Sequence, residues 1–459
     1  MKIAIIGTGY VGLTTAVVLS YLNHDVAAVD KDESKLTLLH EGKSPIHEPG
    51  IQNLLDEVWR TIRFTPRASE VVPEAELILI AVGTPPKQNG EADTRHVEQA
   101  AREVAQVCLP DRHYTLVVKS TVPIGTNQRV VEVVEDVFSA RGVRGNVSVA
   151  SNPEFLQEGL ALQGAFYPDR IIVGANSDEA IDTLRRLYQP ILEQTFDPPS
   201  EFRRPSTYHL PPLMTTDPNS AEMIKYAANT FLSLKISFIN EIAGLCEEVE
   251  ADVTEVARGI GLDARIGQQF LRAGLGWGGS CYPKDTAALL GVAAQSGYQM
   301  PITEAARTVN FRQRERIVEK VRDTLGTLKG KTIGILGLAF KPNTDDVREA
   351  PALDIIRELL AEGAVVHAHD PIAIANARQV LNENDATGNN RLCFIEDVDE
   401  LSYDTDALVL VTEWESYHKL ELRRIAKQMK TPILIDGRNV YSPEEARAAG
   451  FHYIGIGRT

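Results

Sequence analysis

The feature that most constrains the fold is a series of short apolar runs without polar alternation. A strand with one wet face alternates between apolar and polar residues, whereas a run without alternation is typical of a strand covered on both faces. In the N-terminal third of the chain such runs, rich in Val and Ile, are separated by helical patterns and occupy 2–7, 25–30, 76–85, 115–122 and 147–153. This order predicts a doubly wound α/β domain with a parallel sheet.

A second set of apolar runs, at 331–340, 364–371, 406–414 and 431–439, predicts another α/β unit near the C-terminus. Between the two sets lies a helical pattern that is much longer than usual. It covers 217–253, with Ser220 as the expected N-terminal cap. Some 30 helical residues would span roughly 45 Å, which exceeds the core of a small domain. We therefore expect this helix to link domains and to contribute to a subunit interface.

Composition excludes several classes of protein. The chain has 459 residues and a formal net charge of −16, which argues against a nucleic-acid partner or an anionic membrane surface. No apolar run is long enough to span a membrane. Four widely spaced cysteines predict neither a disulfide framework nor a zinc site, so no metal is expected. The N-terminal residues lack the pattern of a secretory signal, and a cytoplasmic location is the expectation.

The first apolar run is followed by the sequence GTGYVG and then by a helical pattern. Gly7, Gly9 and Gly12 fit the dinucleotide fingerprint, in which glycines allow a tight turn and a close approach of the backbone to a pyrophosphate. Asp30, at the end of the next strand, can accept hydrogen bonds from a ribose 2′-hydroxyl and favours NAD over NADP. Lys35 is a candidate adenosine contact or, equally, a solvated helix charge.

A cysteine within a glycine-rich stretch, GLGWGGSCYPKD at 274–285, is a candidate nucleophile. The residues after Cys281 predict a helix with Pro283 in its first turn. A thiol at a helix N-terminus with Lys284 nearby is expected to have a lowered pKa. Spacing of i,i+4 would place Asp285 on the same face as the thiol. The remaining cysteines, at positions 108, 246 and 393, lie in apolar patterns and are interpreted as inert core residues.

Two further pairs share the i,i+4 spacing. Glu154 and Glu158 could supply a general base, while Lys225 and Asn229 could stabilise an oxyanion. Taken singly, each pair is more typical of a solvated helix face. Together with a nicotinamide site and Cys281, the functional interpretation becomes the favoured one.

The C-terminal unit has no third glycine in register, so a second NAD is not expected there. Lys341, Arg348 and Arg438 fall at predicted strand ends or loops, where open α/β sheets bind ligands. Such cations suit a phosphate or diphosphate. Solvated surface charge is the alternative.

The combined motifs resemble the UDP-glucose/GDP-mannose dehydrogenase family over essentially the whole chain. The resemblance rests on GTGYVGL, GTPP, KSTVPIGT, NPEFLQEG, AEMIKYAANTFLSLKISFINE, GLGWGGSCYPKD, GLAFKPNTDDVREAP and DGRN. It implies two Rossmann-like doubly wound parallel-sheet domains joined by the long helix and a helical domain. The expected domains are 1–200 for NAD, 201–325 for the central helices and cysteine loop, and 326–459 for a UDP-sugar.

The resemblance also implies an activity: oxidation of a sugar-nucleotide primary alcohol to a carboxylate with two NAD⁺. Cys281 would add to the aldehyde as a thiohemiacetal, which is oxidised to a thioester and hydrolysed. UDP-glucose, giving UDP-glucuronate, is the expected substrate. GDP-mannose or a UDP-N-acetylhexosamine is the nearest alternative. A catalytically silent sensor of NAD or a sugar nucleotide, and an ordinary two-electron alcohol dehydrogenase, are alternatives of another kind.

Residue roles follow from the same resemblance. Lys225, Asn229 and Asp285 would polarise the C6 oxygen, Glu154 would act as acid and base in hydrolysis, and Thr121 would position the water. The cofactor would also contact Tyr10, Val11, Thr84, Thr121, Glu158 and Arg348. Substrate contacts would include Glu154, Phe155, Leu156, Phe270, Arg272, Leu275, Gly276, Trp277, Gly278, Phe340, Lys341 and Arg438. Arg265 would reach the substrate of a neighbouring subunit in a homodimer or higher homo-oligomer.

Two segments carry no functional expectation. His47 stands where the family often has an aromatic residue, and the Pro-rich stretch 196–212 has no assigned role.

Overall fold

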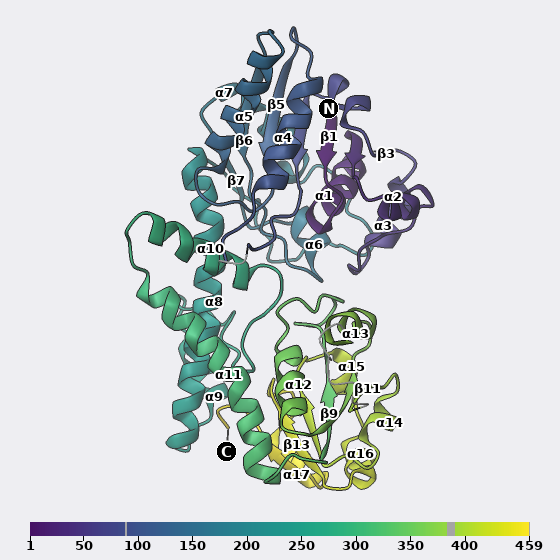
Figure 1. Cartoon of the computed structure of the whole chain (residues 1–459), viewed down its shortest axis with the longest axis vertical. Coiled ribbons are helices and arrows are strands. Elements are labelled where there is room, and N and C mark those ends of the chain that lie inside the picture. Colours follow the sequence, from purple (N-terminus) through teal and green to yellow (C-terminus); the bar gives the residue numbers. More distant parts are fainter. Residues whose placement is uncertain (88–89, 383–390, 459) are drawn as a thin grey trace. The chain divides into compact units, whose positions relative to one another are not determined.

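The computed structural model describes residues 1–87, 90–382 and 391–458 and consists of two compact units, Met1–Ala228 and Asn229–Thr459 (Figure 1). Each unit contains one β-sheet with helices packed against it. The division between the units falls inside one long helix. The fold class expected from the sequence is confirmed.

The N-terminal unit contains an eight-stranded sheet in the order β3-β2-β1-β4-β5-β6-β7-β8. Its first six strands have the order of a dinucleotide-binding domain, in which the order reverses between β1 and β4. All neighbours are parallel except β6 and β7, an antiparallel pair that the sequence did not predict. The strands are β1 (Lys2–Ile6), β2 (Asp25–Val29), β3 (Arg63–Thr65), β4 (Leu77–Ile80), β5 (His113–Val118), β6 (Asn146–Ser151), β7 (Ile171–Ala175) and β8 (Leu213–Thr216).

Both faces of this sheet are covered, as the non-alternating strands predict. Along β1, Ile3 and Ile5 belong to one hydrophobic core, whereas Ala4 and Ile6 belong to the other. The α-helices are α1 (Tyr10–Tyr21), α2 (Glu33–His40), α3 (Ile51–Val58), α4 (Arg95–Val107), α5 (Thr126–Ala140), α6 (Ala161–Phe166) and α7 (Asp178–Glu193).

The predicted long helix is α8 (Pro218–Glu248), which Figure 1 shows as one continuous helix. It begins two residues before the expected cap, Ser220. Asp217 caps it instead, since its carboxylate accepts the Ser220 N–H at 2.9 Å. An aspartate is as good a cap as a serine, and Pro218 then takes the first helical position, where its missing N–H is harmless.

The C-terminal unit repeats the dinucleotide-binding strand order in its six-stranded sheet, β11-β10-β9-β12-β13-β14. The sequence predicted four of these strands and missed the two short outer ones. The strands are β9 (Thr332–Leu336), β10 (Val365–His369), β11 (Leu392–Phe394), β12 (Ala407–Leu410), β13 (Ile433–Asp436) and β14 (His452–Ile454). The helices after α8 are α9 (Val253–Gly261), α10 (Tyr282–Gln295), α11 (Pro301–Leu325), α12 (Pro351–Ala361), α13 (Ile374–Asn382), α14 (Val398–Ser402), α15 (Glu415–His418), α16 (Leu422–Gln428) and α17 (Pro443–Ala448).

The Pro-rich stretch has a structural role. Its aromatic side chains pack against Phe166 and Tyr167, with Phe196 5.4 Å and Phe202 6.2 Å from Phe166 between ring centroids. Tyr208 meets Tyr167 edge-on at 5.3 Å. This aromatic cluster closes one end of the N-terminal core.

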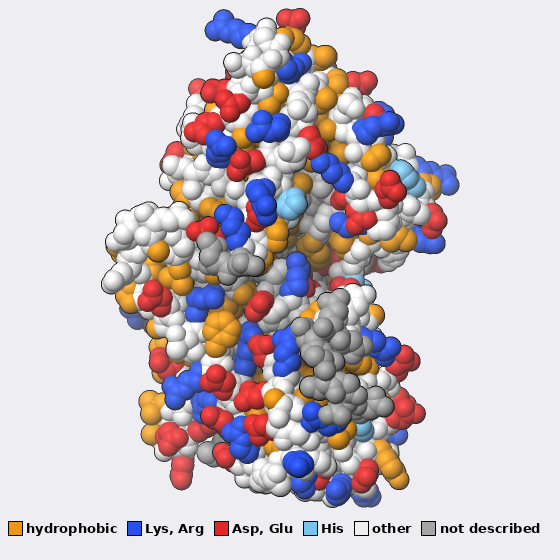
Figure 2. Space-filling view, viewed as in Figure 1, with side chains coloured by type: hydrophobic (Ala, Val, Ile, Leu, Met, Phe, Trp, Pro, Cys, Tyr) orange, Lys and Arg blue, Asp and Glu red, His pale blue; other side chains and the backbone are white. Residues whose placement is uncertain are grey.

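Charges of both signs are interspersed over the face in Figure 2. The net charge of −16 therefore does not gather in one patch on that face. No helix in the described part of the chain is long and apolar enough to cross a membrane.

Candidate functional site

The fingerprint glycines form a turn that side chains would block. Gly7 has φ +100°, and a Cβ on Gly12 would lie 1.9 Å from the Gly7 carbonyl oxygen. In contrast, a Cβ on Gly9 would meet nothing within 4 Å. Gly7 and Gly12 therefore make the tight turn and the close helix packing. The open space at Gly9, at the N-terminus of α1, suits a pyrophosphate, so these residues fit NAD.

Asp30 is fixed beside this turn. One carboxylate oxygen accepts from both the N–H and the hydroxyl of Thr8 at 2.7 Å, and the other accepts from the Asp32 N–H at 3.0 Å. Burial acts to raise the pKa of Asp30, but these hydrogen bonds and Lys35, 3.8 Å away, together hold it below its usual value. Asp30 is thus a permanent anion at neutral pH. Sequence reasoning missed Thr8, although it sits inside the fingerprint.

Glu48 lies next to His47, in a segment for which the sequence predicted no function, and it contacts the start of α1 beside the glycine turn. Its buried carboxylate accepts the Tyr10 hydroxyl and the N–H groups of Gly159, at 2.6 Å, and Ala161, at 2.7 Å. It thereby joins the start of α1 to the segment after Glu158. The sequence signal that could have identified Glu48 is weak: an acidic residue between two prolines, Pro45 and Pro49.

A buried ion pair joins the start of α8 to the segment after β6. The Lys225 ammonium lies 3.2 Å from Glu154, whose other oxygen accepts the Leu156 N–H at 2.5 Å. The ammonium also lies 5.3 Å from the centre of the Phe155 ring. Four predicted residues, Glu154, Phe155, Leu156 and Lys225, are therefore brought together in one place. A buried ammonium beside a carboxylate can polarise an oxygen and exchange a proton.

Two more expected residues lie after neighbouring strands, Thr84 after β4 and Thr121 after β5. The Thr84 hydroxyl donates to the Thr121 carbonyl at 2.8 Å, so both lie at the ends of neighbouring strands, β4 and β5. Glu222, which sequence reasoning missed, accepts the N–H groups of Gly125 and Asn127 at 2.7 and 2.8 Å. Burial raises the pKa of Glu222 to about 7 against these hydrogen bonds.

The C-terminal unit contains the thiol. Cys281 is the residue before α10, and its side chain is exposed. Pro283 is in the first turn, as expected. The Asp285 N–H donates to the Cys281 carbonyl at 2.8 Å, so the predicted i,i+4 turn is formed. Asp285 is fully buried and accepts from Asn229 at 2.6 Å and from Lys284 at 2.5 Å.

The glycines before the thiol are crowded by the protein itself. A Cβ on Gly276 would lie 2.4 Å from the Asn310 amide oxygen, and one on Gly278 would lie 2.2 Å from the Glu349 carbonyl. Glycine is therefore required here for packing, in addition to any approach to a ligand. Leu275 and Trp277 are buried.

The cationic loops of the C-terminal unit lie where its strand order reverses, between β9 and β12. Lys341 lies 5.2 Å from the Phe340 ring centre. Arg438 donates to the Val411 carbonyl at 2.7 Å and the Gly276 carbonyl at 3.4 Å, and it pairs with Glu413 at 3.2 Å. Arg438 thus joins the ends of β12 and β13 to the glycine loop.

Other expected residues are more exposed. Arg265 pairs with Asp263, and Arg348 pairs with Asp346, each at 2.6 Å. Arg272 is exposed, and Phe270 adopts a left-handed backbone with φ +64°. Cys108 and Cys246 are buried, as expected of inert thiols. Cys393 is only half-buried, because the short strand β11 lies at the sheet edge.

The structure thus forms two sets of expected residues, one in each unit. Glu154 and Lys225 belong to the N-terminal unit with the glycine turn, whereas Asn229, Asp285 and Cys281 belong to the C-terminal unit. Lys225 and Asn229 lie one turn apart on α8.

Comparison with known protein families gives three matches in chain order. They are the NAD binding domain of the UDP-glucose/GDP-mannose dehydrogenase family over 1–192, its central domain over 219–312 and its UDP binding domain over 334–443. These ranges leave the expected boundaries at 200 and 325 as predictions.

Curated relatives match over the full length. The chain is 43% identical to UDP-glucose 6-dehydrogenase TuaD of Bacillus subtilis, covering 100% of this chain and 93% of that protein. It is 41% identical to a UDP-glucose 6-dehydrogenase of Pseudomonas aeruginosa, covering 100% and 98%.

Two solved structures support the same conclusion. A UDP-glucose dehydrogenase from Pyrobaculum islandicum has a TM-score of 0.87 at 37% identity, covering 100% of this chain and 98% of that one. A UDP-D-ManNAc dehydrogenase from Pyrococcus horikoshii has a TM-score of 0.83 at 26% identity, covering 100% and 99%. This chain therefore belongs to the UDP-glucose/GDP-mannose dehydrogenase family and is an NAD-dependent dehydrogenase with a UDP binding domain.

Proposed function

We propose that the protein is a UDP-glucose 6-dehydrogenase, which oxidises UDP-glucose to UDP-glucuronate in two steps. The relatives at 37–43% identity over the whole chain carry this name. Bound NAD⁺ supplies a hydride acceptor, and each turnover uses two molecules in succession. The alcohol carbon C6 thus loses four electrons in total.

Cys281 makes a two-step oxidation possible without release of the aldehyde. Its sulfur forms a bond to the aldehyde carbon, giving a thiohemiacetal that can lose a second hydride and become a thioester. Water then breaks the C–S bond, leaving the carboxylate and the free thiol. The observation that carries the proposal is the exposed thiol immediately before α10, beside the buried pair of Asp285 and Asn229. A two-electron alcohol dehydrogenase needs no such thiol.

The polar groups on α8 would manage the charge that develops on the C6 oxygen. Lys225 and Asn229 would donate hydrogen bonds to this oxygen, and Asp285 would hold a water through its carboxylate. Glu154, paired with Lys225, would take a proton from the alcohol or the hydrolytic water and return it later. Thr121 would orient that water. These roles require Lys225 and Asn229 to meet one substrate, which their one-turn spacing on α8 allows.

Binding of the sugar nucleotide would use the carboxyl ends of β9, β12 and β13. Phe340, Lys341 and Arg438 offer an aromatic face and two cations to a uridine diphosphate. Residues of the glycine loop and of 154–156 would contact the sugar, with Phe270 and Arg272 nearby. The cofactor would occupy the glycine turn, Asp30, Lys35 and Thr84, with Glu158 and Arg348 as further contacts.

The face of α8 that remains exposed favours a homodimer as the functional form. Phe231, Phe238 and Leu245 recur every seven residues and are 61%, 48% and 58% exposed. The buried face of the same helix is mixed, with Ser233 and Ser237 beside Ile239 and Ala243. A heptad stripe can pack against the same stripe of another subunit around a two-fold axis. The partner proposed for this surface is therefore a second copy of the chain. Arg265 would complete the neighbour's site.

A panel of sugar nucleotides tests the proposal. The purified protein is incubated with NAD⁺ and either UDP-glucose, GDP-mannose or a UDP-N-acetylhexosamine, and NADH formation is followed by absorbance. We expect kcat/KM to be at least about a hundredfold higher for UDP-glucose, because a site built for one set of hydroxyls leaves polar groups unpaired with another. Faster oxidation of GDP-mannose or of a UDP-N-acetylhexosamine would assign the alternative substrate. No NADH with any of them would favour a silent sensor.

A further inference from the structure

The glycine loop 274–277 is held by side chains from two helices. The Gly274 N–H donates to Asn240 on α8 at 2.8 Å, and its carbonyl accepts from Gln313 on α11 at 2.9 Å. Asn310, also on α11, accepts the Trp277 N–H at 2.6 Å and donates to the Trp277 carbonyl at 3.0 Å. The amide of Asn310 thus satisfies both backbone groups of Trp277, as a neighbouring strand would.

These polar side chains interrupt an apolar face. Asn310 is fully buried, Gln313 is 3% exposed and Arg314 is 4% exposed. The same face of α11 continues with Ile317 and Val321, which are both fully buried. Burying an amide or a guanidinium costs free energy unless it is hydrogen-bonded, so an apolar residue would serve packing better. We therefore interpret the hydrogen bonds to the glycine loop as the reason why these polar side chains are buried here.

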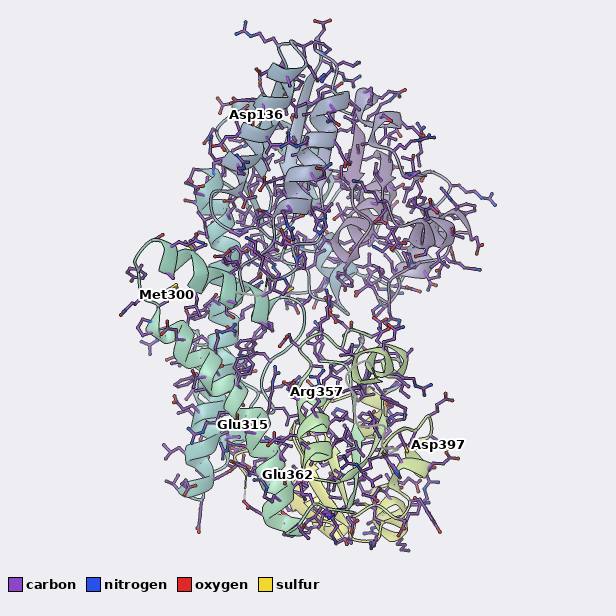
Figure 3. The ribbon with its side chains drawn as sticks, in the orientation of Figure 1. Asp136, Met300, Glu315, Arg357, Glu362 and Asp397 are labelled. Carbon is purple, nitrogen blue, oxygen red and sulfur yellow. The ribbon has the colours of Figure 1, made fainter. Side chains whose placement is uncertain are left out.

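Arg314 extends the contact to a third segment. Its guanidinium donates to the Trp277 carbonyl at 3.0 Å and to the Glu349 carbonyl at 3.1 Å, and it pairs with Asp354 on α12. In Figure 3, Met300 marks the residue before α11, and Glu315 and Arg357 mark the neighbouring helices α11 and α12. One buried side chain therefore joins the glycine loop to the end of the 340–349 segment.

We propose that Asn310 and Arg314 are positioning residues that fix the glycine loop and, through it, Cys281 and the segment with Phe340 and Lys341. The Asn310 amide oxygen occupies the space that a Cβ on Gly276 would fill, and Gly276 has φ +94°. The loop conformation and Asn310 thus require each other. Cys281 follows Trp277 by four residues. The proposed effect on turnover rests on the proposed function, but the effect on the thiol does not.

Two variants separate positioning from simple loss of packing. Asn310→Asp has the same shape and keeps the acceptor for the Trp277 N–H, but it places a carboxylate oxygen against the Trp277 carbonyl. Arg314→Lys keeps the charge beside Asp354 but lacks the planar fork, in which one nitrogen reaches Asp354 while the other reaches the two carbonyls. Glu315→Gln, on the exposed side of the same helix, is the matched control.

The experiment measures four quantities on the full-length protein. These are KM and kcat for UDP-glucose, Kd for NAD⁺, and the rate of Cys281 alkylation by iodoacetamide with Cys281→Ala as blank. We expect each variant to raise KM or lower kcat by about tenfold and to change the alkylation rate severalfold. Binding of NAD⁺ is expected to weaken by no more than about twofold, since every proposed cofactor contact except Arg348 belongs to the N-terminal unit. Glu315→Gln is expected to match the wild type.

Wild-type kinetics and alkylation in folded Arg314→Lys would overturn the proposal, whether or not Asn310→Asp folds. A loss of NAD⁺ binding of about tenfold or more in both variants would also overturn it, because an effect of that size on the N-terminal unit indicates general destabilisation. If the wild type fails to oxidise UDP-glucose, the proposed function fails, whereas altered alkylation in the variants still supports positioning of the thiol.

Discussion

At the scale of single residues, Cys281 and Asp285 show how one helical turn can hold two groups in different environments. The thiol is exposed before the first residue of α10, whereas the carboxylate one turn later is buried between Asn229 and Lys284. An exposed sulfur can meet a carbonyl carbon, and a carboxylate with two partners stays in one orientation. This arrangement suits a nucleophile that acts beside a fixed polar group.

Replacing the thiol tests its role. Cys281→Ala is expected to lower formation of the acid by at least about a thousandfold, while leaving Kd for NAD⁺ and for UDP-glucose within about twofold, because only the sulfur is lost. Product is followed by chromatography, with Ser296→Ala, at the exposed C-terminal end of α10, as the control. Four-electron oxidation at the wild-type rate in the alanine variant would reject the covalent mechanism.

Asp30 is expected to enforce the preference for NAD. A carboxylate and a 2′-phosphate about 4 Å apart repel by about 4 kcal/mol at an effective dielectric constant of 20. Asp30→Asn keeps an acceptor for Thr8 and removes the charge. The ratio of kcat/KM with NAD⁺ to kcat/KM with NADP⁺ should therefore fall by at least about tenfold. An unchanged ratio would mean that Asp30 does not face the ribose.

The sequence predicted the functional residues that stand in short local motifs, but it did not predict the residues that hold them in place. The fingerprint glycines, Asp30 and Cys281 stand in short motifs, where spacing along the chain is enough. Glu48 and Glu222 contact segments about one hundred residues away, and no pattern near either residue identifies its partner. Tertiary packing alone brings such groups together.

At the scale of elements, α8 differs from an ordinary surface helix in where its apolar and polar residues lie. Its exposed stripe is apolar, and its buried side carries Lys225, Asn229 and Glu222. The sequence pattern predicted its length and its apolar content, because no internal proline interrupts it. It could not predict the cap at Asp217 or the short strands β3, β11 and β14, since three-residue strands have too few residues for periodicity.

Glu222 on α8 should make stability depend on pH. Burial raises its pKa in the folded state to about 7 from 4.5. Between these values the folded protein holds a proton that the unfolded chain releases, so stability falls as pH rises through this range. The full effect is about 3 kcal/mol. Denaturation at pH 5 and pH 8 is expected to show this loss in the wild type and not in Glu222→Gln. If the free energies of unfolding of the wild type and Glu222→Gln differ by the same amount at both pH values, this prediction is wrong.

At the scale of the whole molecule, the two units share a strand order but differ in the hydrogen bonds of the acidic residue that follows β2 and β10. Gly337, with φ +101°, stands after β9 as Gly7 stands after β1, and Asp370 follows β10 as Asp30 follows β2. Asp370, however, accepts five hydrogen bonds, among them one from the Trp414 indole, and is 2% exposed. The hydrogen bonds within the protein therefore occupy the oxygens of Asp370, whereas Asp30, in the described part of the chain, accepts from Thr8 and Asp32 only.

The proposed dimer is tested by a charge on the apolar stripe of α8. Phe238→Glu is expected to convert the protein to a monomer by light scattering, because a buried unpaired carboxylate is costly. Leu109→Glu is the matched control, since Leu109 is equally exposed, at 48%, but lies outside α8. A wild-type protein that is monomeric at assay concentration would reject this interface.

The role of Arg265 is tested by mixing two defective variants. If Arg265 completes the neighbour's site, a hybrid of Arg265→Ala and Cys281→Ala subunits has one site with both defects and one with neither. Unfolding and reassembling the two together should then restore activity toward about half of the wild-type value per hybrid. Hybrids that form but stay inactive would place Arg265 in the site of its own subunit.

A four-electron oxidation through Cys281 is tested by the number of NADH molecules formed for each substrate molecule. A limiting, known amount of UDP-glucose is consumed to completion with excess NAD⁺, and NADH is read by absorbance while the nucleotide products are separated by chromatography. We predict two NADH for each UDP-glucose, with UDP-glucuronate as the product and no free aldehyde. One NADH for each UDP-glucose, with the aldehyde accumulating, would contradict it.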